Sequence, residues 1–167
     1  EQGMQTLGRS LNSLSGHFNL YSTIPVGVGM GASAALCVAM ARWFSAMDML
    51  ADAETHAFAR QLENLFHGQS SGLDISGVAA TSGLYFKQGV SLPLEQAWQP
   101  KWFLSSCGQI GITSHCINQV QALWHEDESY AAQIDRQMAD CVLEARYALE
   151  KYTPESQKIL IKSMNNA

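Results

Sequence analysis

The sequence predicts an α+β fold that is rich in helix and contains a few, mainly antiparallel, strands. Several long segments repeat apolar residues at the spacing typical of amphipathic helices. Shorter segments with aromatic residues, bounded by glycine and proline, are typical of strands. A glycine-rich segment that begins at Ile24 leads directly into an apolar run of helical length, and this run predicts a buried helix.

Composition limits the classes of protein to consider. With 167 residues, 47% of them hydrophobic and 15% charged, the chain can fold around a sizeable core. A net charge of -5 and the lack of a basic run argue against nucleic acid as a partner, because its phosphates attract clustered Lys and Arg. The most apolar stretch, residues 32–49, contains Arg42 and Asp48, so the sequence predicts no membrane span.

The cysteines indicate a reducing compartment. The chain has four, widely spaced and without a C-x-x-C pattern: Cys37, Cys107, Cys116 and Cys141. Neither a zinc site nor a disulfide framework is indicated. The chain also opens at Glu1 without the pattern of a signal peptide, so we expect reduced thiols and a cytoplasmic location.

The first half of the chain is predicted to be mainly helical. The predicted elements are a helix over 1–14, a strand over 16–24, a central buried helix over 33–50, and a helix from an N-cap at Asp52 through Phe66. Gly68 is expected to end the last helix. Its predicted inner face comprises Ala57, Phe58, Leu62, Leu65 and Phe66.

The glycine-rich segment, I-P-V-G-V-G-M-G-A-S-A-A-L over 24–36, is a candidate anion site. Gly27, Gly29 and Gly31 can take positive φ and allow close approach to the backbone. Unpaired amides at the start of the following helix, together with its dipole, would attract an anion such as a nucleotide phosphate. The spacing is neither G-x-G-x-x-G nor that of a P-loop. Taken alone, such a turn serves tight packing more often than ligand binding.

A second candidate segment is E-N-L-F-H-G-Q-S-S-G-L-D over 63–74, which has a carboxylate at each end and two serines between. Glu63 lies near the predicted C-terminus of a helix, where the dipole disfavours it, so we expect a cationic partner. The simpler alternative makes Glu63 a surface residue and Asp74 the cap of a short helix over 75–81.

The second half is predicted to contain two strands and three helices. The strands cover 83–89 and 101–107 and flank a turn-rich piece with Pro93 and Pro100. The helices are expected from Thr113 or Ser114 to Trp124, over 129–152 and over 155–164. The long helix carries an apolar stripe that we expect to be core: Ile134, Met138, Val142, Leu143, Ala145 and Leu149.

Together, the two segments resemble known kinase motifs. P-x-G-x-G-M-G-x-S-A-A from Pro25 resembles the second signature of the GHMP small-molecule kinases. A glutamate followed by H-G-x-S-S-G-x-D is similar to the mevalonate kinase branch of that family. Met30 stands where Leu is usual, Ala32 replaces the first of two serines, and Ser70 replaces a proline, which should loosen the turn. Residues 77–86 and 106–117 extend the resemblance weakly.

The resemblance implies a partial GHMP-kinase-like fold. About 1–90 would be the end of the N-terminal nucleotide-binding domain with its phosphate loop, and about 91–167 the start of the C-terminal domain. The first and third family signatures are not found, so the chain looks like the middle of a kinase. We expect such a piece to be inactive alone and to form a homodimer or associate with the rest of the enzyme.

The resemblance also implies a site for ATP and Mg²⁺. Asp74 would be the catalytic base, and Ser33 and Glu63 would form a hard-ligand pair for Mg²⁺. The expected substrate contacts are His67, Ser71, Gly72 and Thr113. The expected phosphate contacts are Pro25, Gly27, Gly29, Met30, Gly31, Ala32, Ser33 and Ala34.

The implied activity is ATP-dependent phosphorylation of a small-molecule hydroxyl in isoprenoid synthesis, with mevalonate giving 5-phosphomevalonate. Another GHMP kinase, acting on phosphomevalonate, a sugar or homoserine, is an alternative. A different class is a non-catalytic interaction module that retains the fold. Ala32 favours that class, whereas the joint presence of Ser33, Glu63 and Asp74 argues against it.

Overall fold

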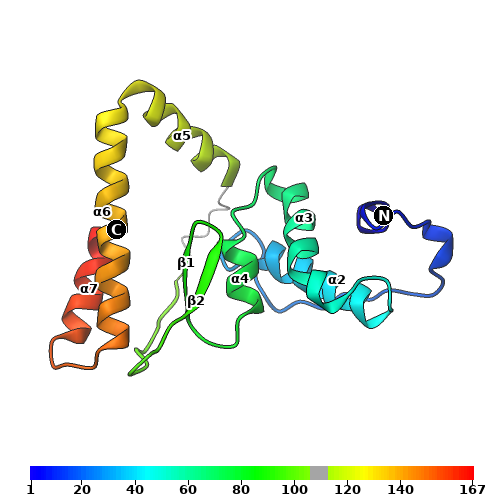
Figure 1. Ribbon diagram of the computed structural model, residues 1–167, viewed down its shortest axis with the longest axis horizontal. Helices are drawn as coiled ribbons and strands as arrows, with labels where there is room; N and C mark the ends of the chain where they lie inside the picture. Colours follow the sequence, from blue (N-terminus) through cyan, green and yellow to red (C-terminus); the bar gives the residue numbers. More distant parts are fainter. Residues whose placement is uncertain (106–112) are drawn as a thin grey trace. The chain divides into compact units, whose positions relative to one another are not determined.

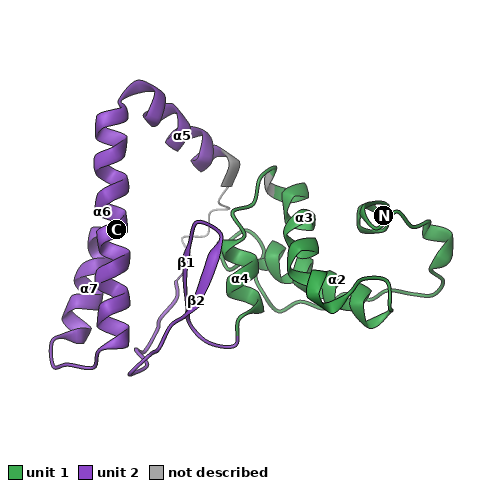
Figure 2. Cartoon of the chain, viewed as in Figure 1, with its two compact units in different colours: residues 1–80, 108–111 green, residues 81–107, 112–167 purple. Residues whose placement is uncertain are grey.

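The computed structural model describes residues 1–105 and 113–167 of the chain (Figure 1). The chain forms two compact units (Figure 2): unit 1 covers residues 1–80, and unit 2 covers 81–105 and 113–167 of the described residues. The structure is rich in helix and has a two-stranded antiparallel sheet, which is consistent with the predicted α+β class.

Unit 1 is helical throughout its regular structure. Its elements are α1 (Gln2–Thr6), the 3-10 helix η1 (Leu11–Ser13), α2 (Ala32–Ala46), the 3-10 helix η2 (Asp52–Glu54), α3 (Thr55–His67) and α4 (Leu73–Ala79). Helices α2, α3 and α4 contact one another, as Figure 1 shows. The segment from the glycine-rich stretch to Asp74 therefore lies within one packed unit.

Two predictions for the N-terminal part of unit 1 are wrong. The helix expected over 1–14 is interrupted, because Gly8 takes a φ of 64° and separates α1 from η1. The strand expected over 16–24 is irregular. An alternating pattern needs a neighbouring strand to become a sheet, and unit 1 as described supplies none.

The core of unit 1 lies where one face of α2 meets α3 and α4. Phe44 of α2 packs edge-on against Phe58 of α3, with ring centroids 5.6 Å apart. Ile75 of α4 is fully buried in the same cluster. The other core residues are Met4, Ala34, Cys37, Val38, Ala41, Ala59 and Leu62. Burial of each large side chain contributes about 1.5–3 kcal/mol to stability. More of the core residues come from α2 than from α3 or α4, so α2 is the central helix, as predicted.

The inner face of α3 is rotated from the one predicted. Phe58 and Leu62 are buried as expected, but Leu65 and Phe66 are more than half exposed, and Ala57 is exposed. Glu63 is buried instead, with 2% of its surface accessible. The apolar pattern predicted the wrong face of α3 because the carboxylate of Glu63 occupies an inward position.

Helix starts and ends follow local backbone chemistry. Gly68 ends α3 with a φ of 75°, as predicted. Asp52 is not the N-cap of α3, because it lies in η2, where its carboxylate accepts a hydrogen bond from Ser45. The N-cap of α4 is Gly72, with a φ of 87°, so Asp74 is not a capping residue.

Unit 2 begins with a tight hairpin. Strands β1 (Leu84–Lys87) and β2 (Val90–Pro93) pair antiparallel, with Lys87 opposite Val90. Gln88 and Gly89 between them both have positive φ, as a two-residue hairpin turn of type I′ requires. The sequence predicted β1 but assigned β2 to a turn-rich piece. Residues 101–105 of the other predicted strand are irregular, and the rest of it lies outside the described residues.

The helices of unit 2 are α5 (Thr113–Glu126), α6 (Glu128–Glu150) and α7 (Ser156–Asn166), close to the predicted bounds. The segment that follows β2 contacts α6, because the Trp98 indole N–H donates a hydrogen bond to the Ala148 carbonyl at 2.7 Å. The Arg146 guanidinium lies 4.7 Å from the ring centroid of Tyr85. None of the described helices is long and apolar enough to cross a membrane.

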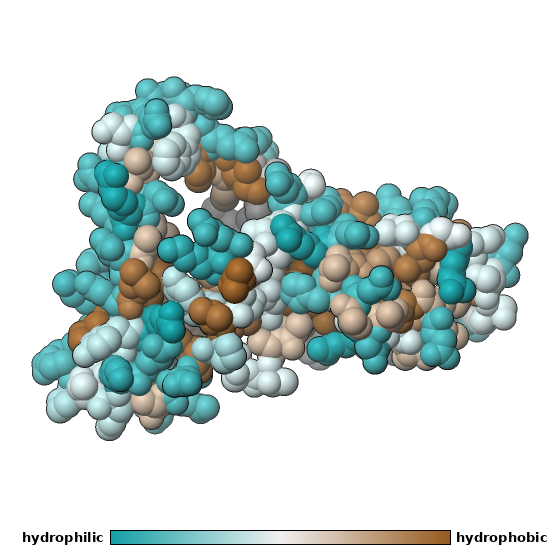
Figure 3. Space-filling view, viewed as in Figure 1, coloured by the Kyte–Doolittle hydropathy of each residue, from teal (hydrophilic) through white to brown (hydrophobic). Residues whose placement is uncertain are grey.

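Half of the stripe predicted as core on α6 is exposed. Met138, Val142 and Leu143 have 42–50% of their surface accessible, and the buried residues of α6 are the smaller Ala131, Cys141 and Ala148. Figure 3 shows hydrophobic side chains at the surface of both units. Ile134, Ala145 and Leu149 are half-buried, so the prediction was wrong for the three exposed residues of the stripe.

Candidate active site

The glycine-rich segment has the backbone conformation that its sequence allows. Gly27, Gly29 and Gly31 take φ values of 80°, 75° and 67°, and α2 begins directly after Gly31. The first amides of any α-helix have no partner within the helix, so the N-terminus of α2 presents N–H groups toward this segment. A Cβ at Gly31 would lie 3.6 Å from Val78 of α4, so α4 borders the end of this segment.

Glu63 is the buried acidic residue of the candidate site. Its Oε2 accepts a hydrogen bond from the Ser70 hydroxyl. Its Oε1 is buried without a hydrogen-bond partner in the described part of the chain. An unpaired buried carboxylate oxygen is costly, typically about 1–3 kcal/mol or more, which a bound cation would relieve.

Glu63 lies beside α2. Burial raises the pKa of the Cys37 thiol to about 11, and the nearby Glu63 carboxylate adds to that rise. Cys37 follows Ser33 by one helical turn, so the two residues share a face of α2. Glu63 therefore lies beside the face of α2 that carries Cys37 and Ser33.

The residues that could hold a metal fit Mg²⁺ better than a closed metal cage. Among the side chains that the structure describes, no group of three or more His, Cys, Asp or Glu could hold an ion. Mg²⁺ is commonly bound by one or two protein oxygens together with waters and substrate phosphates. The unpaired Oε1 of Glu63 and the hydroxyl chemistry of Ser33 suit such a site.

Asp74 is exposed and lies in the first turn of α4, where the helix dipole favours a carboxylate. Val78 follows it by one turn on the same face, and Val78 borders Gly31. The fold of unit 1 thus brings the face of α4 that carries Asp74 to the start of α2.

The predicted substrate contacts differ in what the structure describes of them. Ser71 is exposed, and its hydroxyl accepts a hydrogen bond from the Leu73 amide at 3.2 Å. Gly72 is buried, and a Cβ there would lie 3.4 Å from the Arg60 side chain. His67 ends α3 and Thr113 begins α5 in unit 2, but their side chains, and residues 106–112, lie outside the described residues.

Sequence reasoning missed the network that holds the turn between α3 and α4. The Ser70 carbonyl accepts a hydrogen bond from the Arg60 side chain at 3.1 Å. The Ser70 amide donates one to the Asn64 side-chain oxygen at 2.7 Å. The Gly72 amide donates to the Ser70 hydroxyl at 3.0 Å. These hydrogen bonds hold the turn without the proline, and the looser turn stays a prediction. The available signal was the helical spacing of Arg60, Glu63 and Asn64, which places them on one face.

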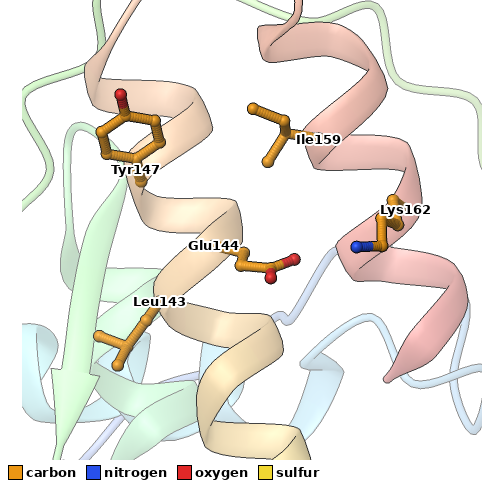
Figure 4. A pocket seen from close by; sticks show the side chains of 5 residues that line it. All are labelled: Leu143, Glu144, Tyr147, Ile159 and Lys162. Carbon is orange, nitrogen blue, oxygen red and sulfur yellow. The ribbon is translucent and has the colours of Figure 1, made fainter.

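A separate cavity lies in unit 2. It has a volume of about 410 Å³, and its described lining comprises Leu143, Glu144 and Tyr147 of α6 with Ile159 and Lys162 of α7 (Figure 4). None of the predicted site residues is among these. The candidate site consequently rests on unit 1.

Comparison with known proteins identifies this region. The profile of the family described as "GHMP kinases N terminal domain" matches residues 2–84. This segment belongs to the GHMP kinase family. It spans both the glycine-rich segment and the turn around Ser70, so the predicted resemblance is confirmed at the level of the family.

Two curated relatives are both named mevalonate kinase. Mevalonate kinases from Pyrococcus horikoshii and Pyrococcus abyssi are each 29% identical to this chain, over 143 and 151 residues. The alignments cover 84% and 85% of the chain but only 42% and 43% of the relatives. The chain thus spans about two fifths of the length of the curated relatives it matches. No solved structure gives a significant match.

Proposed function

We propose that the protein takes part in ATP-dependent phosphorylation of a small-molecule hydroxyl, with mevalonate as the acceptor. The observation that carries this proposal is the buried Glu63 carboxylate, with one oxygen tied to Ser70 and the other unpaired, beside the helix that starts at the glycine-rich segment. The identity to mevalonate kinases favours mevalonate over other acceptors. The division into an N-terminal part over about 1–90 and a C-terminal part over about 91–167 belongs to the same proposal.

The start of α2 would bind the phosphates. Backbone amides from Gly29 to Ala34, with the positive end of the α2 dipole, would donate to phosphate oxygens. Positive φ at Gly29 and Gly31 keeps Cβ atoms away from this approach. Pro25, Gly27, Met30 and Ala32 would shape the segment and contribute no charge.

Ser33 and Glu63 would hold Mg²⁺ through a hydroxyl and a carboxylate oxygen. When bound, the ion supplies positive charge against the phosphate oxygens during transfer. A metal at Glu63 would also be the cationic partner expected from its position near the C-terminus of α3.

Asp74 would accept the proton of the attacking hydroxyl. In a loose transition state the proton leaves late, so the position of the carboxylate matters more than a raised pKa. Exposure of Asp74 at the start of α4 leaves it open to substrate. Ser71, Gly72, His67 and Thr113 would contact substrate or phosphate.

The deciding experiment is an ADP-release assay on the full-length protein with mevalonate, phosphomevalonate, a sugar and homoserine offered separately. Asp74→Asn should lower kcat about 100-fold or more with a much smaller change in KM, because it removes only the base. Asp48→Asn is the matched control, since Asp48 is exposed and its φ of 53° suits asparagine. Full activity in Asp74→Asn would refute the base assignment. Turnover with another of these acceptors would replace mevalonate.

A further inference from the structure

Ser70 is the most fully bonded residue of the turn between α3 and α4. It is 7% exposed. Its amide, carbonyl and hydroxyl all have partners: Asn64, Arg60, the Gly72 amide and Glu63. All of these contacts lie within unit 1. Three residues of α3 thus bond to Ser70, and the bonds to Glu63 and the Gly72 amide orient its hydroxyl.

The hydroxyl makes the two Glu63 oxygens different. It donates to Oε2 while it accepts from the Gly72 amide, so its hydrogen is committed to the carboxylate. Oε1 is buried and has no partner in the described part of the chain. A carboxylate held in this way cannot rotate freely, and Oε1 is the oxygen with no hydrogen bond to give up when a cation binds.

We propose that Ser70 is a positioning residue that holds Glu63 for single-oxygen coordination of Mg²⁺ through Oε1. This inference rests on the proposed kinase function. Hydrogen bonds to a ligating carboxylate orient it, and loss of such a bond typically weakens metal affinity about 10–100-fold. The motif that this segment resembles has proline at this position, and proline has neither a hydroxyl nor an amide hydrogen. The device is therefore built from a residue in which this chain departs from the family pattern.

The test measures metal binding on the full-length protein without turnover. Mn²⁺ replaces Mg²⁺, a non-hydrolysable ATP analogue supplies the phosphates, and electron paramagnetic resonance counts the free Mn²⁺. Ser70→Ala should weaken Mn²⁺ binding about 10-fold. Binding of the analogue without a divalent ion should stay at the wild-type value, because Ser70 does not touch the phosphates in this proposal.

Two controls separate positioning from folding. Asn64→Ala removes the bond from the Ser70 amide but leaves the hydroxyl, so its Mn²⁺ affinity should stay close to wild type. Ser70→Thr and Ser70→Val are nearly equal in shape and differ in the hydroxyl. Only Ser70→Val should lose affinity, even where both variants share some packing strain.

The outcomes distinguish this inference from the function on which it rests. Wild-type affinity in Ser70→Ala, or an equal loss in Asn64→Ala, would overturn the positioning role. If Glu63→Gln loses Mn²⁺ binding while Ser70→Ala keeps it, the proposed metal site stands and only Ser70 is misassigned. If wild type takes up no Mn²⁺ with the analogue, or Glu63→Gln binds it normally, both proposals fail.

Discussion

Two glycine-containing turns of unit 1 reach defined shapes by different means. The turn before α2 relies on backbone conformation, with Gly27, Gly29 and Gly31 all at positive φ. The turn before α4 also has positive φ at Gly68 and Gly72, but side chains of α3 bind its central residue as well. In the proposed site, the first turn would present amides to phosphate, and the second would hold the Glu63 carboxylate in place for the metal.

The largest expected effect tests the packing of α2, which follows the first turn, against α3, which precedes the second turn. Cys37 of α2 has its thiol pKa raised to about 11 by burial and by Glu63 of α3, from an ordinary value of 9.0. Above pH 9.0 the unfolded chain loses this proton while the folded chain keeps it. The free energy of unfolding should therefore be undiminished below pH 9.0 and fall by about 2–3 kcal/mol as pH rises to 11.

The measurement is urea denaturation of wild type and Cys37→Ala at several values between pH 8 and 11. Alanine cannot titrate, so the variant should show a shallower loss of stability than wild type. Tyrosines, lysines and the other cysteines titrate in both proteins, and their contribution cancels in the difference. Parallel curves would mean that burial and the Glu63 carboxylate do not raise the pKa of the Cys37 thiol.

The same contrast between backbone conformation and side-chain bonds separates what the sequence predicts from what it does not. The positive φ of the glycines and the end of α3 at Gly68 were predictable, because glycine alone takes these conformations without strain. The network around Ser70 was not, because helical spacing places Arg60 and Asn64 on one face but does not assign their hydrogen bonds to Ser70. Motif spacing found the candidates at Glu63 and Asp74, and their assigned roles remain predictions.

Tertiary context explains the errors in the fold. The segment over 16–24 alternates like a strand, yet a strand needs a partner, and a single chain pattern does not reveal one. On α6 three residues of the apolar stripe are exposed, while Ala148 and Cys141 are buried. Periodicity identifies which residues share a face but not what covers that face.

An intermediate effect is expected at the second turn. Gly72→Ala places a Cβ 3.4 Å from Arg60 at a φ of 87°, so we expect a loss of about 1–3 kcal/mol in the free energy of unfolding. Gly77→Ala is the matched control within α4, where φ is ordinary and the space is open. That variant should gain about 0.5–1 kcal/mol. Equal stabilities in urea denaturation would show that the second turn tolerates a side chain.

The smallest change in stability is expected at the first turn, where it separates backbone conformation from packing. Gly29 has a φ of 75° and nothing within 4 Å of an added Cβ, so the only cost of a side chain there is conformational. Asparagine tolerates positive φ and should cost only a few tenths of a kcal/mol, whereas valine should cost about 1 kcal/mol or more. If the segment binds phosphate through its amides, Gly29→Asn should keep most of the affinity for the ATP analogue and Gly29→Val should lose it. Equal affinities in a fluorescence titration would mean that the conformation at Gly29 does not control phosphate binding, and the first turn would then serve packing alone.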